Sequence, residues 1–113
     1  MRSDRERLED ILAAIAQIEQ YTLEGKSAFD RERLLQDGVI HQIVIIGEAV
    51  RPISSELREQ KADLPWAAIV AMRNILVHRY YEVNLEIVWL VVEQNLPDIK
   101  RQIEAILQEL GTE

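Results

Sequence analysis

Apolar residues in this chain recur every three or four positions, and no segment alternates convincingly between apolar and polar residues. The first spacing lines side chains along one face of an α-helix, whereas alternation would indicate a β-strand. The run Ile43-Val44-Ile45-Ile46 alone would also suit a buried strand, but it lies inside a long helical pattern from Arg33 to Arg51. The sequence therefore predicts an all-α fold, an antiparallel bundle of four to five helices.

Length and charge limit the function further. The 113 residues contain no internal repeat or linker, which predicts one domain spanning 1–113. The absence of cysteine excludes disulfides and thiolate metal sites. No apolar stretch approaches the roughly 18 residues of a membrane span, and the charged N-terminus resembles no secretion signal, so we expect a cytoplasmic protein. A net charge of −7 argues against a general nucleic-acid binder but leaves room for a local basic patch or a small catalytic site.

Helix-capping residues, glycine and proline predict where the helices begin and end. Ser3-Asp4-Arg5-Glu6 has the form of a capping box and opens a first helix, which we expect to end at Gly25. Asp30 is expected to cap a second helix, which Pro52 kinks or ends. The first helix of the chain is expected to bury one apolar stripe, made of Leu8, Ile11, Leu12, Ile15 and Ile18.

Residues of the same kinds predict the helix boundaries in the second half of the chain. A short helix is expected around 54–61, and Pro65 then marks the start of a helix running from about Trp66 to Tyr80. Asn84 can cap the last helix, which Pro97 kinks or splits.

The helix ending near Tyr80 carries the residues most suited to chemistry. On an ideal helix Asn74 and His78 are neighbours one turn apart, and His78 lies about 140° round from Arg73. The apolar residues expected to face the core are Ile69, Met72, Ile75 and Leu76. The remaining arc of this helix is polar and carries Arg73, Asn74, His78 and Tyr80.

These residue types suit cleavage of RNA without a metal or cofactor. A histidine can accept or donate a proton near neutral pH, and an arginine can stabilise charge developing on a phosphate. The 2′-hydroxyl of the RNA can supply the nucleophile, and Asn74 can orient the imidazole or the substrate. A second acid or base would come from another copy of His78 across the two-fold axis of a homodimer.

The same residues also admit structural explanations. His78 near a helix C-terminus can simply stabilise the helix dipole. Arg73 can form a structural ion pair with Glu48, and Tyr80 and Tyr81 can be core or interface residues.

Two sequence blocks resemble a known family. The segment from Arg73 to Tyr80 resembles the R-N-x-x-x-H-x-Y signature of HepT-like toxins within the HEPN superfamily. The flanks resemble it as well, with Leu64-Pro65-Trp66 before the motif and Val88-Trp89 after it. Ile46-Gly47-Glu48-Ala49 resembles the other recurrent block of the family. The resemblance spans nearly the whole chain and keeps the order and spacing of the blocks.

The resemblance implies an α-helical homodimer in which both R-x4-H motifs line a cleft at the interface. It implies a metal-independent endoribonuclease with Arg73 and His78 as the catalytic pair, supported by Asn74 and Glu48. It further implies the toxin half of a type VII toxin–antitoxin system. The partner would be a minimal nucleotidyltransferase antitoxin that transfers AMP to Tyr80.

The sequence departs from the family pattern at two positions. Ala71 stands where glycine is common, and Asn84 stands where aspartate is common; both suit the predicted helices. Two other functions stay open from the sequence. The chain could be a non-catalytic HEPN module that binds a nucleotide or a nucleotidyltransferase, or a purely structural helical dimer.

Overall fold

Within the described residues, 2–79 and 82–111, the computed structural model is helical and contains no strand, which confirms the predicted all-α class. The elements are α1 (Asp4–Tyr21), α2 (Gly25–Arg31), α3 (Arg33–Val50), α4 (Ser55–Gln60), α5 (Trp66–His78), α6 (Leu85–Leu90), the π-helical turn η2 (Val91–Asn95) and α7 (Leu96–Gly111). No helix in these ranges is both long and apolar enough to cross a membrane.

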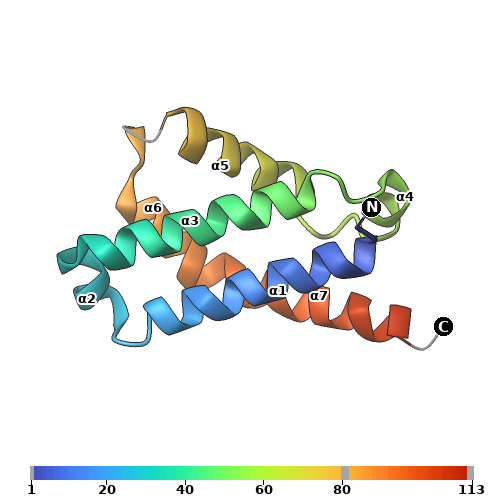
Figure 1. Ribbon diagram of the computed structural model, residues 1–113, viewed down its shortest axis with the longest axis horizontal. Coiled ribbons are helices and arrows are strands. Elements are labelled where there is room, and N and C mark those ends of the chain that lie inside the picture. The colour runs from blue at the N-terminus through green and yellow to red at the C-terminus, as the bar shows by residue number, and fades with distance from the viewer. Residues whose placement is uncertain (1, 80–81, 112–113) are drawn as a thin grey trace.

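The long helices form a bundle centred on α1 and α3, which lie side by side and run in opposite directions (Figure 1). Helix α5 packs along the other side of α3, and α7 packs against α1. The core between them is almost entirely aliphatic. Its most completely buried large side chains are Phe29, Leu8, Ile11, Ile18, Ile46, Ile103, Val39, Val50 and Val88.

The capping box predicted for α1 is present. The Ser3 hydroxyl accepts from the Glu6 backbone N–H, and the Glu6 carboxylate accepts from the Ser3 backbone N–H, both at 3.1 Å. These hydrogen bonds from Ser3 hold the pKa of the exposed Glu6 carboxyl below its usual value. In the predicted stripe Leu8, Ile11, Ile15 and Ile18 are buried, and Leu12 packs against them half-buried.

Two predicted helix boundaries were wrong. Gly25 does not end α1, which stops at Tyr21; it begins the additional short helix α2, with φ at +85°. Asp30 lies inside α2 and caps nothing, because α3 begins after Glu32. The physical reason is tertiary: α2 is secured by the burial of Phe29, whose carbonyl accepts from the Gln36 side chain at 2.9 Å.

Most other boundaries agree with the prediction, but α5 ends at His78, short of the predicted end near Tyr80, which lies outside the described residues. Helix α3 ends at Val50, two residues before Pro52, and Ser54 caps α4. Asn84 caps α6 by accepting from the Glu86 and Ile87 backbone N–H groups. The interruption predicted at Pro97 is the η2 turn just before it, where a wider turn accommodates a ring that cannot donate a helical hydrogen bond.

Candidate active site

Helix α5 sets the position of Arg73 by packing closely against α3. The Arg73 side chain lies on the α3-facing side of α5 and is only 16% exposed. The residue opposite it is Gly47, which is buried in α3. A Cβ atom built on Gly47 would lie 2.2 Å from Cβ and 2.8 Å from Cγ of Arg73. Only glycine fits there, and its absent side chain is what allows the two helices to approach at Arg73.

The guanidinium of Arg73 is held by two polar side chains. Nη1 donates to Oδ1 of Asn74 at 3.0 Å, and Nη2 lies 3.5 Å from Oε1 of Glu48. Its Nε is buried and has no hydrogen-bond partner within the described residues. Glu48 is 55% exposed and its contact is long, so this ion pair contributes little to stability. The arginine is therefore positioned but has hydrogen-bonding capacity left for a ligand.

His78 is the last residue of α5 and is exposed. Within the described residues, no hydrogen bond or ion pair involves its imidazole. The structure thus brings Arg73, Asn74 and Glu48 together, and within the described residues no hydrogen bond or ion pair links His78, at the end of the same helix, to this cluster. Asn74 was expected to orient the imidazole or the substrate, and its carbonyl oxygen accepts from Arg73 instead.

The tyrosine of the motif, Tyr80, lies outside the described residues, as does Tyr81. The residues on either side of them are in contact. Arg79 and Glu82 form an exposed ion pair at 3.9 Å, and the Glu82 backbone N–H donates to the Arg79 carbonyl at 2.8 Å. This contact brings together the two ends of the segment that carries both tyrosines.

One predicted core residue was placed wrongly. Ile75 is 48% exposed and does not face the core. The reason is that α5 is apolar around most of its circumference, so the helical period does not reveal which apolar side is buried. Leu76 is buried as predicted, and Ile69 and Met72 are half-buried.

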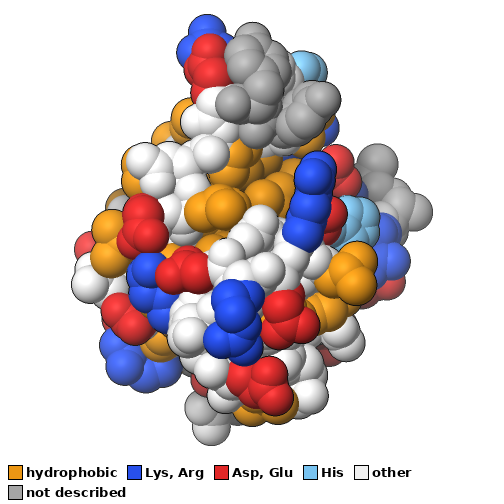
Figure 2. All heavy atoms as spheres, turned by 90° about the vertical axis from the view of Figure 1, so that its left-hand side faces the viewer, with side chains coloured by type: hydrophobic (Ala, Val, Ile, Leu, Met, Phe, Trp, Pro, Cys, Tyr) orange, Lys and Arg blue, Asp and Glu red, His pale blue; other side chains and the backbone are white. Residues whose placement is uncertain are grey.

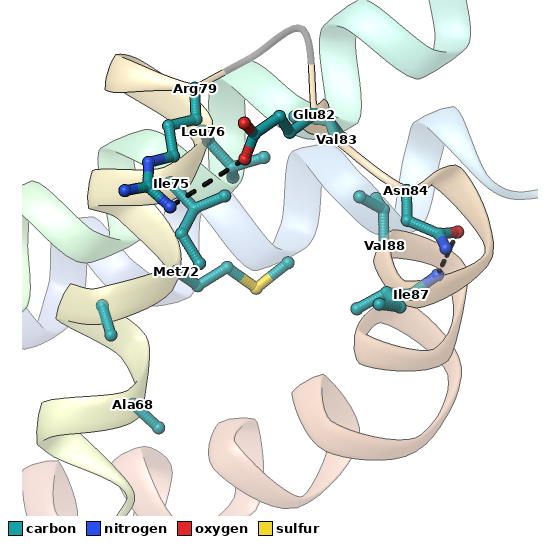
Figure 3. Close-up of a pocket in the computed structure, with 11 residues that line it drawn as sticks. Ala68, Met72, Ile75, Leu76, Arg79, Glu82, Val83, Asn84, Ile87 and Val88 are labelled. Carbon is teal, nitrogen blue, oxygen red and sulfur yellow. Dashed lines mark hydrogen bonds and ion pairs between the residues drawn. The ribbon is translucent and has the colours of Figure 1, made fainter.

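Ile75 instead lines an apolar groove of about 490 Å³ between α5 and α6, here called the α5–α6 groove. Met72 and Ile75 enter it from α5, and Val83, Ile87 and Val88 enter from the opposite side (Figure 3). Figure 2 looks at the end of the molecule that carries α2 and α6, and shows hydrophobic side chains gathered in a hollow there. This groove was not predicted from the sequence; the signal available was the apolar character of Ile87, which is 55% exposed.

No group of three or more histidine, cysteine, aspartate or glutamate side chains in the described part of the chain is arranged to hold a metal ion. The candidate site is therefore a cluster of an arginine, an amide and a carboxylate, with an exposed histidine on the same helix.

The fold and the motif define a class, an all-α bundle that carries R-x4-H at the end of a helix. The family model described as ribonuclease HepT-like matches residues 11–106, and the chain belongs to this family, within the HEPN superfamily. No solved structure matches the chain significantly.

Three relatives illustrate the range of the family. The chain is 39% identical, over 91% of its own length, to a protein of Methanocaldococcus jannaschii named "Gamma-glutamylcyclotransferase and putative RNase", of which it spans 47%. It is 33% identical to a "Probable ribonuclease HepT" of Thermococcus cleftensis, covering 93% of this chain and 96% of that protein. It is 29% identical to an "mRNA nuclease HepT" of Shewanella oneidensis, covering 91% and 95%.

Proposed function

We propose that this chain is a metal-independent endoribonuclease, the cytoplasmic toxin of a type VII toxin–antitoxin system, with Arg73 and His78 as its catalytic residues. Membership of the ribonuclease HepT-like family supports the reaction class. The observation that carries the proposal is the state of Arg73: Asn74 and Glu48 hold its guanidinium in place and engage one N–H of each terminal nitrogen, which leaves the other N–H of each for a ligand. An arginine positioned in this way suits the binding of a phosphate.

Each side chain has a defined part in the proposed reaction. His78 removes the proton from a ribose 2′-hydroxyl, whose oxygen then attacks the adjacent phosphorus. Arg73 stabilises the negative charge that develops on the phosphate oxygens. The bond to the 5′-oxygen breaks, and a second copy of His78 protonates that leaving oxygen. The products are a 2′,3′-cyclic phosphate and a 5′-hydroxyl, and no metal takes part.

The second His78 requires a homodimer, and the α5–α6 groove supports one. The groove is apolar and open, and Ile75 and Ile87 expose about half of their surface beside it. Such patches on small proteins commonly mark interfaces. His78 lies on the exposed side of α5 near Ile75, so a two-fold axis close to the end of α5 would bring both His78 residues to one cleft.

Regulation would act on Tyr80. In the proposed system a nucleotidyltransferase antitoxin transfers AMP from ATP to the tyrosine hydroxyl and releases pyrophosphate. The added phosphate is negative and bulky, and it would be attached seven residues beyond Arg73 in the sequence. It would therefore repel the RNA phosphate and obstruct the cleft.

Expression in cells tests both parts of the proposal. Induced wild-type protein should arrest growth, and Arg73→Ala and His78→Ala should not. Co-expression of a minimal nucleotidyltransferase antitoxin of the proposed kind should relieve the arrest by wild type and leave Tyr80→Phe toxic. If toxicity persists in both alanine variants, the assignment of Arg73 and His78 is wrong. If Tyr80→Phe is silenced as efficiently as wild type, the regulatory part is wrong.

The second candidate is a non-catalytic HEPN module that binds a nucleotide or a nucleotidyltransferase through the same polar arc, with a phosphate on Arg73 and no turnover by His78. The net charge of −7 favours this reading, because repulsion opposes binding of a polyanion. The substitution His78→Ala distinguishes the two candidate functions. In the binding module this change leaves the function intact, whereas in the ribonuclease it abolishes RNA cleavage and retains partner binding.

A further inference from the structure

A second concave surface adjoins the Arg73 cluster from the other side of α3. This groove lies between α1 and α3 and has a volume of about 430 Å³, and we call it the α1–α3 groove. Glu48 lines the groove and also contacts the Arg73 guanidinium. The groove and the Arg73 cluster thus meet at one side chain. Its volume falls within the range of about 300–1,000 Å³ typical of sites for small ligands.

Small side chains make the floor of the α1–α3 groove. Ala13 and Ala14 come from α1, and Ala49 comes from α3. Methyl groups let a flat ligand approach both helices closely. The half-buried Ile45 adds an apolar contact beside them. The floor therefore suits the face of a planar, weakly polar ring.

Two primary amides line this floor from opposite helices, Gln17 from α1 and Gln42 from α3. Within the described residues neither side chain takes part in a hydrogen bond. Each amide offers two donors and one acceptor group, the combination that recognises the edge of a nucleobase. A pair of free amides across an apolar floor is thus suited to hold a base by its edge.

The charges along the groove favour an anion despite the acidity of the whole chain. Asp10 is neutralised by Arg2 at 2.7 Å, and Glu48 faces Arg73. Arg7 also lines the groove, and its guanidinium forms no ion pair within the described residues. One arginine is therefore available at the groove for a phosphate, which is the local basic patch that an acidic RNA-processing protein needs.

We propose that the α1–α3 groove binds one nucleotide of a single-stranded RNA, next to the phosphate held by Arg73. The base lies on the alanine floor with its edge against Gln17 and Gln42, and an adjoining phosphate binds Arg7. This proposal rests on the ribonuclease function and adds a base-recognition subsite to it. Cleavage is then expected to depend on the base at one position beside the cut.

RNA binding without turnover tests the groove directly. The full-length His78→Ala protein is titrated in EDTA with fluorescent pentaribonucleotides of A, C, G or U, and Kd is measured for each. Adding Gln17→Ala and Gln42→Ala together should raise Kd about tenfold for the preferred base and flatten the preference among bases. Adding Arg7→Ala should weaken all four RNAs and lower the salt dependence by about one ion.

Matched controls and thermal melting keep the test decisive. Gln20→Ala on α1 and Arg101→Ala on α7 change exposed residues outside the groove and should leave Kd within about twofold, since no contact to the RNA is lost. Groove variants that melt like their parent and bind RNA equally well overturn the proposal. So does a loss of self-association without a loss of RNA affinity, because the groove would then hold a second copy of the chain. A wild type that binds these RNAs through the groove but never cleaves them overturns the ribonuclease function and leaves the subsite intact.

Discussion

Gly47 and Arg73 are in such close contact that no side chain at position 47 would fit between α3 and α5. A Cβ on residue 47 would lie 2.2 Å from the Cβ of Arg73, far inside any van der Waals contact. The backbone of α3 therefore sets the position of Arg73, and Glu48, the next residue of α3, reaches its guanidinium. This relationship joins the two sequence blocks of the family into one site.

Gly47→Ala should consequently separate α3 from α5 at Arg73. We expect a loss of about 1–3 kcal/mol in the free energy of unfolding, the usual cost of overpacking a tight contact, together with a large loss of RNA cleavage. Thermal unfolding and single-turnover cleavage measure the two effects. Gly111→Ala is the matched control, because an added Cβ there would have its nearest neighbour at 3.9 Å. Wild-type stability and cleavage in Gly47→Ala would show that the contact does not position Arg73.

Asn74 should act through Arg73. Asn74→Ala removes the oxygen that accepts from Nη1, so we expect kcat to fall about tenfold with little change in stability, since Asn74 is exposed. Asn74→Asp keeps an acceptor at the same place and should restore most of the rate. Steady-state cleavage gives kcat and KM separately. Equal defects in the alanine and aspartate variants would argue against this positioning role.

The α5–α6 groove should control self-association. Ile75→Glu places a charge on its apolar wall, and we expect the proposed dimer to dissociate and cleavage to be lost with it. Sedimentation velocity and cleavage are measured on the same samples. Leu34→Glu is the control, because Leu34 is 85% exposed on α3 and does not line the groove. A dimeric, active Ile75→Glu protein would place the interface elsewhere.

The capping box should make stability depend on pH. The pKa of Glu6 is lowered in the folded chain by its hydrogen bonds with Ser3, from an ordinary value of 4.5. A lowered pKa means that this contribution is present above pH 4.5 and is lost as the pH falls through the folded value. Glu6→Gln keeps a capping group without the titration, so its melting temperature should converge on that of wild type in acid. A constant difference between pH 6 and pH 3 would contradict this.

Helix boundaries that depend on interactions between residues close in the sequence could be predicted from it. Boundaries that depend on tertiary contacts could not. Ser3, Asn84 and Pro52 act on their own backbone or on the adjacent turn, and the boundaries they predict are confirmed. Gly25 and Asp30 were misassigned because the burial of Phe29 stabilises a short helix that contains both of them. The helix propensities of the residues in this segment carry no information about that tertiary contact.

The candidate site also contains some features that could be predicted from the sequence and others that depend on tertiary packing. The contact between Arg73 and Glu48 was considered from the sequence as a structural ion pair, and the two side chains lie 3.5 Å apart. The exposure of Ile75 and the α1–α3 groove were not predicted, since both depend on which side of a helix its neighbour covers. In α5, where apolar residues occur on nearly every side, the period alone cannot identify the buried one.

Cleavage of RNA by the purified protein in excess EDTA tests the central claim most directly. Wild type, His78→Ala and Arg73→Ala are incubated with total RNA, and the ends of the fragments are mapped. We predict metal-free cleavage by wild type that leaves 2′,3′-cyclic phosphate and 5′-hydroxyl ends, and its loss in both variants. Folded, unmodified wild-type protein that cuts no RNA, or cuts only when metal is restored, would contradict the account.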